Sequence, residues 1–420
     1  MLPAFIIAMR SSERVLYLDA IIRVVLAVYI AVLPFKALRI VERNGFILLL
    51  GLLFGWCIVN RRFFYSRTPY DMLLLAFVVW VGFTIPFAVV PFYSLQEYGK
   101  LLQHMVVFYA VIYFFKELRA RQILLGLVGL VAVIVTAYGL SQCNLQNPQA
   151  MVSFLSAEVW FTTFLVMVIP FALVLALGEG SLAVRSGGAI AVGMMLACLL
   201  ATQSRAGLVA LVGEAWVIAW FLRSVSSRIF AIFVTTGMIA MASLVFNNDG
   251  ATGVSADIAQ ALPVKRGALS VLHRLKIWEF ALSEIAKHWL VGIGYGNLSY
   301  LFLYGQDQEA DMSEDFPIMQ AGTHNIFLYL ALHVGLPGLL LFGWFIIRII
   351  RKTADAYHDA QEWVPKAILL GTVSSVAGLM LRLQFDQMFV GSLAIFFWVL
   401  LALSVLSLSP CGGRAKDCRA

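Results

Sequence analysis

Twelve runs of apolar residues, separated by short polar connections, fill most of the chain. They cover 16–35, 45–59, 70–90, 98–115, 123–141, 158–177, 188–204, 207–222, 229–246, 326–350, 366–383 and 388–408. Each run is near the length of about 20 residues that a helix needs to cross a bilayer. Because backbone polar groups cannot be left unpaired in lipid, such runs predict spanning helices. We therefore expect an all-α polytopic membrane protein with about twelve transmembrane helices.

The composition agrees with this prediction. Of the 420 residues, 61% are hydrophobic and only 13% are charged, whereas a soluble domain is about half apolar and about a quarter charged. The net charge of +7 might suggest a nucleic-acid partner in a soluble protein. In a membrane protein, we attribute most of it to basic cytoplasmic loops.

Lysine and arginine residues are divided unequally between the two sets of loops. Eighteen of them fall at the termini and in alternate loops, and the short loops opposite hold six: Lys36, Arg39, Arg43, Lys100, Arg205 and Arg382. Basic residues favour the cytoplasmic side. Twelve crossings place both termini on the same side, so we expect both termini to be cytoplasmic.

The exception to the short loops is the stretch 247–323, which we expect on the outer, non-cytoplasmic face. It divides the chain into three parts: helices 1–9 (1–246), the long loop (247–323), and helices 10–12 with a short tail (324–420). Within the loop, 273–290 predicts an amphipathic helix whose apolar stripe is Leu275, Trp278, Leu282, Ile285 and Trp289. Such a helix lies along the membrane surface or packs on the bundle. A glycine-rich turn (GIGYGN) and an acidic segment (306–315) follow it.

Two arginines at the outer boundary are candidate anion ligands. Arg205 lies in a very short turn between two apolar helices, and Arg274 lies at the start of the amphipathic helix, one turn before Trp278. A guanidinium is a planar, permanently charged donor that suits phosphate oxygens. The alternatives are a snorkelling interfacial arginine for Arg205 and a solvated helix face for Arg274.

His324 is the candidate general base. Thr323 is expected to cap the helix that follows, which puts His324 and Asn325 in its first turn. A helix N-terminus and nearby arginines disfavour an imidazolium, so the histidine should be neutral near pH 7, as a base requires. The alternative is an ordinary interfacial histidine.

Some motifs are missing from the sequence. It has no Asp-x-Asp motif at an outer helix end, no Walker loop, no dinucleotide fingerprint and no nucleophile elbow. Gly292-x-Gly294-x-Gly296 follows a helix rather than a strand, so we interpret it as a turn. The five cysteines are scattered and odd in number, which argues against a disulfide framework or a zinc site. If the chain is an enzyme, arginines rather than a metal must neutralise a leaving group.

These motifs resemble the O-antigen ligase and polymerase superfamily. The resemblance is carried by SRAG (204–207), by 274–278 leading into GIGYGN, and by HNIFLYLALHVGLPG, which fits the ligase signature of His-Asn, a spacer and Gly-x-x-Gly (335–338). The order of a short outer arginine turn, a long periplasmic loop and a His-Asn pair entering a late helix also matches. The resemblance implies a GT-C-like glycosyltransferase architecture in the inner membrane of a Gram-negative bacterium, with the active site facing the periplasm.

The resemblance implies a metal-independent, inverting transfer of polysaccharide from undecaprenyl diphosphate to a sugar hydroxyl of lipid A-core, with no cofactor. Arg205 and Arg274 would bind the diphosphate and stabilise its growing charge, as fixed cations at a partly dry interface can. His324 would accept the proton of the attacking hydroxyl. Lys100, at an outer helix start, is a further candidate for the diphosphate or a mere interfacial lysine. The candidate sugar contacts are Trp278, Tyr295 and Asn325.

Three other functions remain open. The O-antigen polymerase and the protein O-oligosaccharyltransferases of the same superfamily share most of this pattern. A lipid or polysaccharide transporter is an alternative from a different class, but transporters usually show repeated halves and broken helices that meet at mid-membrane. Here the candidate polar residues gather at one surface, and the sequence shows no duplicated halves.

Overall fold

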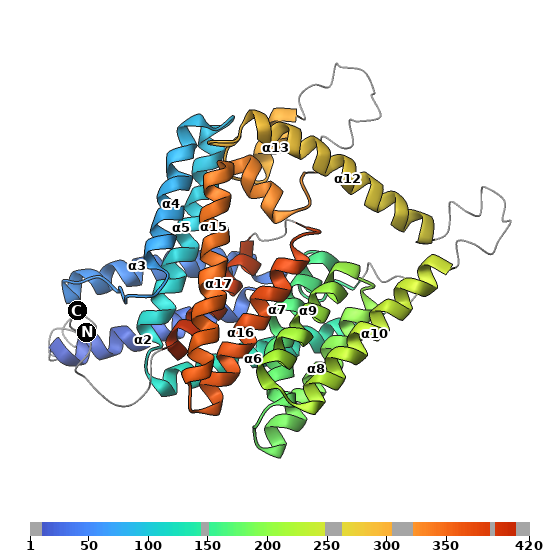
Figure 1. Cartoon of the computed structure of the whole chain (residues 1–420). Coiled ribbons are helices and arrows are strands. Elements are labelled where there is room, and N and C mark those ends of the chain that lie inside the picture. Colours follow the sequence, from blue (N-terminus) through green and yellow to red (C-terminus); the bar gives the residue numbers. More distant parts are fainter. Residues whose placement is uncertain (1–10, 144–150, 248–262, 305–321, 387–390, 409–420) are drawn as a thin grey trace.

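The computed structural model describes residues 11–143, 151–247, 263–304, 322–386 and 391–408, and these residues form helices and no strand (Figure 1). The helices are α2 (Ser11–Val32), η1 (Lys36–Leu38), α3 (Arg39–Asn60), α4 (Asp71–Thr84), η2 (Ile85–Phe87), α5 (Pro91–Phe114), α6 (Leu118–Ser141), α7 (Glu158–Leu177), α8 (Leu182–Ala201), α9 (Arg205–Leu222), α10 (Val225–Asn247), α12 (Pro263–Lys287), α13 (Leu298–Tyr304), α15 (Ile326–Asp359), α16 (Trp363–Arg382) and α17 (Gly391–Leu408).

All twelve predicted apolar segments fall on helices, so the polytopic all-α prediction is confirmed. Among the described residues, eight helical stretches are long and apolar enough to cross a membrane, and two shorter apolar helices cover Asp71–Phe87 and Val225–Ile239. The count of twelve crossings is not confirmed. One reason is that α5 carries Glu97, Lys100, Gln103 and His104 in its first half, which lowers its hydropathy.

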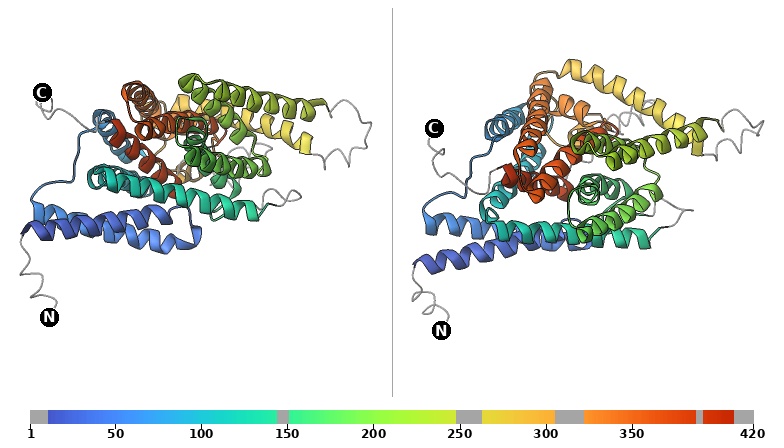
Figure 2. Two further views of the ribbon diagram at one scale, coloured as in Figure 1. Left: turned by 90° about the horizontal axis from the view of Figure 1, so that it is seen from below. Right: turned by 60° about the horizontal axis from the view of Figure 1, so that its bottom comes forward.

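The bundle is built around α16, which packs against α7, α9, α15 and α17. Helices α7 and α17 are mostly buried, whereas α3 is mostly exposed. Figure 2 shows α2, α3 and α6 lying side by side along one flank. The outward residues of α3 are apolar, among them Ile47, Phe54 and Ile58. An apolar face of this kind is what lipid requires, so α3 forms part of the membrane-facing surface.

A break in α15 fixes the end of the bundle that is uppermost in Figure 1. Gly335 has φ 76° and ψ 171°, a conformation that is essentially restricted to glycine. The break frees backbone groups, and the glycine-rich turn pairs with them: Ile293 N donates to Leu332 O (2.9 Å), Gly294 N to His333 O (3.0 Å) and Leu336 N to Trp289 O (2.8 Å). All three glycines at 292, 294 and 296 have positive φ. The interpretation of GIGYGN as a turn is therefore confirmed.

The predicted amphipathic helix is α12, which is longer than expected and lies across the upper end of the bundle (Figure 1). Its packed face matches the predicted stripe only in part, at Ile285 and the half-buried Trp278. Ile277, Ala281 and Ile285 are buried, and Ile285 lies in an apolar cluster with α15 residues. Leu282 and Trp289 are exposed, because the face that meets α15 is rotated from the stripe that hydrophobicity alone indicates.

Two details of the charge distribution were wrong, and some predictions cannot be judged. Arg39 and Arg43 lie in the first turns of α3 rather than in a loop, and Arg121 is buried inside α6, where its guanidinium donates to Leu406 O (2.5 Å). The acidic segment 306–315, the tail and the extreme N-terminus lie outside the described residues.

Candidate functional site

The His324 turn is organised by Asn325 rather than by Thr323. The Asn325 side chain accepts hydrogen bonds from Phe327 N (2.9 Å) and Leu328 N (3.2 Å), so Asn325 is the N-cap and α15 begins at Ile326. The predicted cap, Thr323, instead donates to Asn325 O (3.1 Å). His324 consequently precedes the helix, half-buried, with a positive φ of 45°. The expectation that His324 occupies the first helical turn was therefore wrong.

This turn is held between α12 and the end of α16. The Trp278 indole donates to Thr323 O (3.1 Å) on one side of His324. On the other side, Ile326 N donates to Leu383 O (2.9 Å) and the Asn325 amide donates to Gln384 O (3.1 Å). The backbone around His324 is thus anchored to two helices that are distant in sequence, and this anchoring fixes where the imidazole lies relative to both.

Arg382, at the end of α16, links this turn to α7. Its buried guanidinium donates to Thr163 Oγ1 (2.9 Å) and Val159 O (3.0 Å), and it lies 3.9 Å from the Asp386 carboxylate. Arg274 of α12 lies close enough for its charge to act on Arg382, as does Glu158. The upper end therefore holds two arginines and two carboxylates beside the His324 turn.

Arg205 occupies the first position of α9, after the short turn that the sequence predicted. The Ser204 hydroxyl caps the helix by accepting from Gly207 N (3.4 Å). Gly207 packs so closely that a Cβ there would lie 2.7 Å from Thr162 of α7, whose hydroxyl donates to Glu158 (3.0 Å). Arg205 is exposed. It begins the helix that packs beside α7, the helix whose Val159 and Thr163 bind Arg382.

Two of the candidate sugar contacts have structural hydrogen bonds. The Trp278 indole N–H and the Asn325 amide are both engaged with backbone groups, as described above. Tyr295 differs, because it lines a cavity between α4, α5, α15 and α17. Its phenol is protonated at neutral pH and can donate a hydrogen bond, and burial raises its pKa further.

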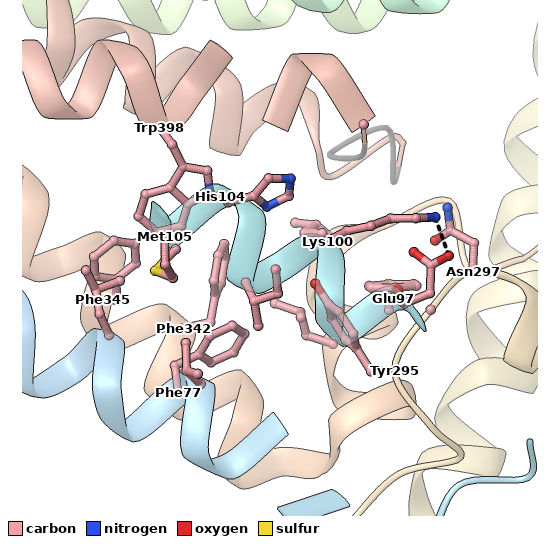
Figure 3. Close-up of a pocket in the computed structure, with 18 residues that line it drawn as sticks. Phe77, Glu97, Lys100, His104, Met105, Tyr295, Asn297, Phe342, Phe345 and Trp398 are labelled. Carbon is pink, nitrogen blue, oxygen red and sulfur yellow. Dashed lines mark hydrogen bonds and ion pairs between the residues drawn. The ribbon is translucent and has the colours of Figure 1, made fainter. Parts of the chain in front are cut away.

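Figure 3 shows that cavity, whose polar and apolar parts are separate. Lys100 forms an ion pair with Glu97 at one end, beside Asn297 and Tyr295. The opposite end is apolar and is lined by Phe77, Met105, Phe342, Phe345 and Trp398. Ile326 and Tyr329 also line the cavity, so it reaches the first turn of α15, next to His324.

The arrangement can neutralise an anion and accept a proton at one surface. Arg274 and Arg382 lie on the two helices that anchor the backbone on either side of His324. No group of three or more His, Cys, Asp or Glu side chains that could hold a metal occurs among the residues the structure describes. The sequence analysis did not identify Glu158 as part of this site, nor the contact of Arg382 with α7. For Glu158, the available signal was its position as a carboxylate at the start of an otherwise apolar run.

Comparison with known proteins matches the part of the chain that carries these candidate residues. Residues 190–343 match the family model described as O-antigen ligase, a span that contains Arg205, Arg274, His324 and the glycines at 335 and 338. No curated protein matches the chain. The match covers the arginine turn, α12 and the His-Asn helix together, and it is consistent with a member of the O-antigen ligase/polymerase superfamily.

Proposed function

We propose that this protein is an O-antigen ligase of the bacterial inner membrane. It transfers polysaccharide from undecaprenyl diphosphate to a sugar hydroxyl of lipid A-core on the periplasmic face, without a metal ion. Members of the superfamily are glycosyltransferase-like enzymes with polysaccharide and lipid-linked substrates. The single observation that carries the proposal is the grouping of Arg274, Arg382 and the His324 turn at the end of the bundle where α9 begins with Arg205.

The reaction needs a base for the hydroxyl and a counter-charge for the leaving group. His324 accepts the proton as the acceptor oxygen attacks the anomeric carbon. The bond between that carbon and the diphosphate oxygen breaks, and undecaprenyl diphosphate leaves with the electron pair. Arg205 and Arg274 stabilise the charge that develops on it. A single displacement inverts the anomeric carbon. Binding both lipids in one bilayer supplies proximity without a soluble domain.

Arg382 is a positioning residue in this scheme. Its guanidinium is engaged by Thr163 and Val159, so it orders the start of α7 and the turn after α16 rather than competing for substrate. Its charge adds to the positive potential around Arg274. This arrangement favours an anion at Arg274 over one at Arg382 itself.

Reconstitution tests the proposal. Purified protein in nanodiscs, supplied with a lipid-linked glycan and lipid A-core, should form a covalent glycan–core product with or without chelator. His324→Ala should abolish transfer and retain donor binding, whereas His358→Ala, at the exposed far end of the same helix, should not alter the rate. Arg205→Ala and Arg274→Ala should weaken donor engagement. Arg228→Ala, just beyond the opposite end of α9, serves as their control.

The ligase, polymerase and transporter functions predict different experimental results. In a deletion strain, loss of all capped core indicates a ligase, whereas a single repeat retained on core indicates a polymerase. Glycan that moves across the membrane without a new bond indicates a transporter. Wild-type activity in all three site variants at normal expression, or a strict need for a divalent metal, would contradict the arginine and histidine mechanism.

A further inference from the structure

A second group of cations lines a groove on the membrane-facing flank of the bundle. The groove lies between α3, α5, α7 and α17, and we call it the cationic groove. Its wall includes Arg39, Arg43 and Ile47 of α3, Lys100 of α5 and Trp160 of α7. It shares Lys100 and His104 with the cavity of Figure 3, so the two spaces adjoin along α5.

The charge of the groove is positive. Arg39, Arg43 and Lys100 face a single lining carboxylate, that of Glu42. Arg39 donates to the Ser156 hydroxyl, and Lys100 pairs with Glu97 from the adjoining cavity. Cations therefore outnumber carboxylates even when Glu97 is included. Among the residues described by the structure, the Arg43 guanidinium has neither a hydrogen-bond nor an ion-pair partner, and it is exposed. It is available to an incoming anion.

The groove adjoins an exposed apolar surface of α3, of the kind that lipid covers. Ile47 lines the groove and is 59% exposed on the outward face of α3. Leu48 and Ile40 of the same helix are exposed as well. A soluble anion gains nothing from such a wall, whereas an acyl chain can lie along it. A cationic head site next to an apolar wall matches an anionic lipid.

The groove also adjoins the candidate site. Trp160 lines the groove, and the preceding residue, Val159, provides the carbonyl that Arg382 binds. The first turn of α7 therefore separates two sets of cations. Arg274 and Arg382 lie on one side, and Arg43 and Lys100 lie on the other. A transfer between two lipids needs two binding sites whose heads converge on one base.

We propose that the cationic groove binds the phosphate-bearing head of the acceptor lipid, while Arg205 and Arg274 bind the diphosphate of the donor. The inference rests on the proposed function and adds the location of the second substrate. Arg43 and Lys100 provide two charges, which suit a phosphate monoester. Lys100 thereby contributes to acceptor recognition and not to the donor diphosphate, the role that the sequence alone suggested.

Acceptor kinetics in the reconstituted system test this inference. Arg43→Ala and Lys100→Ala should each raise KM for the acceptor about tenfold, the usual loss when a charge-assisted hydrogen bond is removed, and leave KM for the donor unchanged. Arg62→Ala, just beyond the far end of α3, is the matched control and should change neither value. Phosphatase treatment of the acceptor should raise its KM about tenfold with the wild-type protein. With Arg43→Ala, the same treatment should raise the acceptor KM little further, because the cation that binds the phosphate is already absent.

Several results would overturn the assignment. A rise in donor KM would place the donor in the groove, and unchanged kinetics for both variants would mean that the groove holds no substrate. Competition by millimolar inorganic phosphate would indicate a site for soluble anions rather than lipids. If the wild type transfers no glycan, the proposed ligase function fails separately. Direct binding then decides: preference for phosphorylated over dephosphorylated acceptor, lost in Arg43→Ala, supports the groove, and equal binding refutes it.

Discussion

Replacing Gly335 by alanine should disrupt the upper end of the bundle, and the structure allows the cost to be worked out. The glycine has a positive φ of 76°, and a Cβ there would lie 2.0 Å from Leu290 O. The strained conformation costs alanine about 1–3 kcal/mol. Moving the 289–294 segment aside also weakens the three backbone hydrogen bonds to Leu332, His333 and Leu336, each of which contributes about 1 kcal/mol. We expect a total loss of about 3–5 kcal/mol.

Gly343→Ala is the matched control for this substitution. Gly343 lies in the regular part of the same helix, and no side chain or neighbouring backbone lies within 4 Å of an added Cβ. Alanine there should be neutral or should stabilise the protein by up to about 1 kcal/mol. Both free energies of unfolding can be measured by denaturant titration in the same detergent.

Hydrogen exchange of individual backbone amides tests whether the effect of Gly335→Ala is confined to this turn. In Gly335→Ala, the amides of Ile293 and Gly294 should exchange faster, because they donate to carbonyls next to the break. The control should leave them protected. Equal stability of the two variants, with Ile293 and Gly294 still protected, would refute the argument that the glycine break is required to seat the turn.

Substitutions at three further positions address the His324 turn. Asn325→Ala should cost about 1–2 kcal/mol through the lost N-cap and should lower the transfer rate; unchanged stability would contradict the capping role. Arg382→Met should destabilise by about 3–5 kcal/mol, because it removes the buried guanidinium with its hydrogen bonds to Thr163 and Val159 and its ion pair. Arg382→Lys should recover part of the loss in the same denaturant titration. Trp278→Phe should slow transfer as much as Trp278→Ala if the indole N–H is what matters, whereas retained activity in the phenylalanine variant would favour sugar stacking.

The secondary structure was largely predictable because it depends on local properties. Apolar length and periodicity indicated every membrane helix, and α7 was predicted with the bounds it has in the structure. The three glycines between 292 and 296 indicated a turn, and all three have positive φ in the structure. The α12 stripe was only partly right, and the N-cap prediction at Thr323 was wrong. Helical periodicity does not say which flank meets a neighbour, and two cap-forming residues, Thr323 and Asn325, lie close enough in sequence to compete for the same role.

The sequence by itself therefore determined the helices, their breaks and the residue types available at their ends. Only the tertiary structure decided which ends meet. Arg382 reaches Thr163 across 219 residues, and Asn325 reaches Gln384 across 59. The grouping of Arg39, Arg43 and Lys100 was likewise not visible in the chain. Apolar helices have similar hydropathy, so their neighbours are selected by close fit, as where Glu214 packs directly on Gly378. Such fit depends on side-chain shape in three dimensions, which no local pattern records.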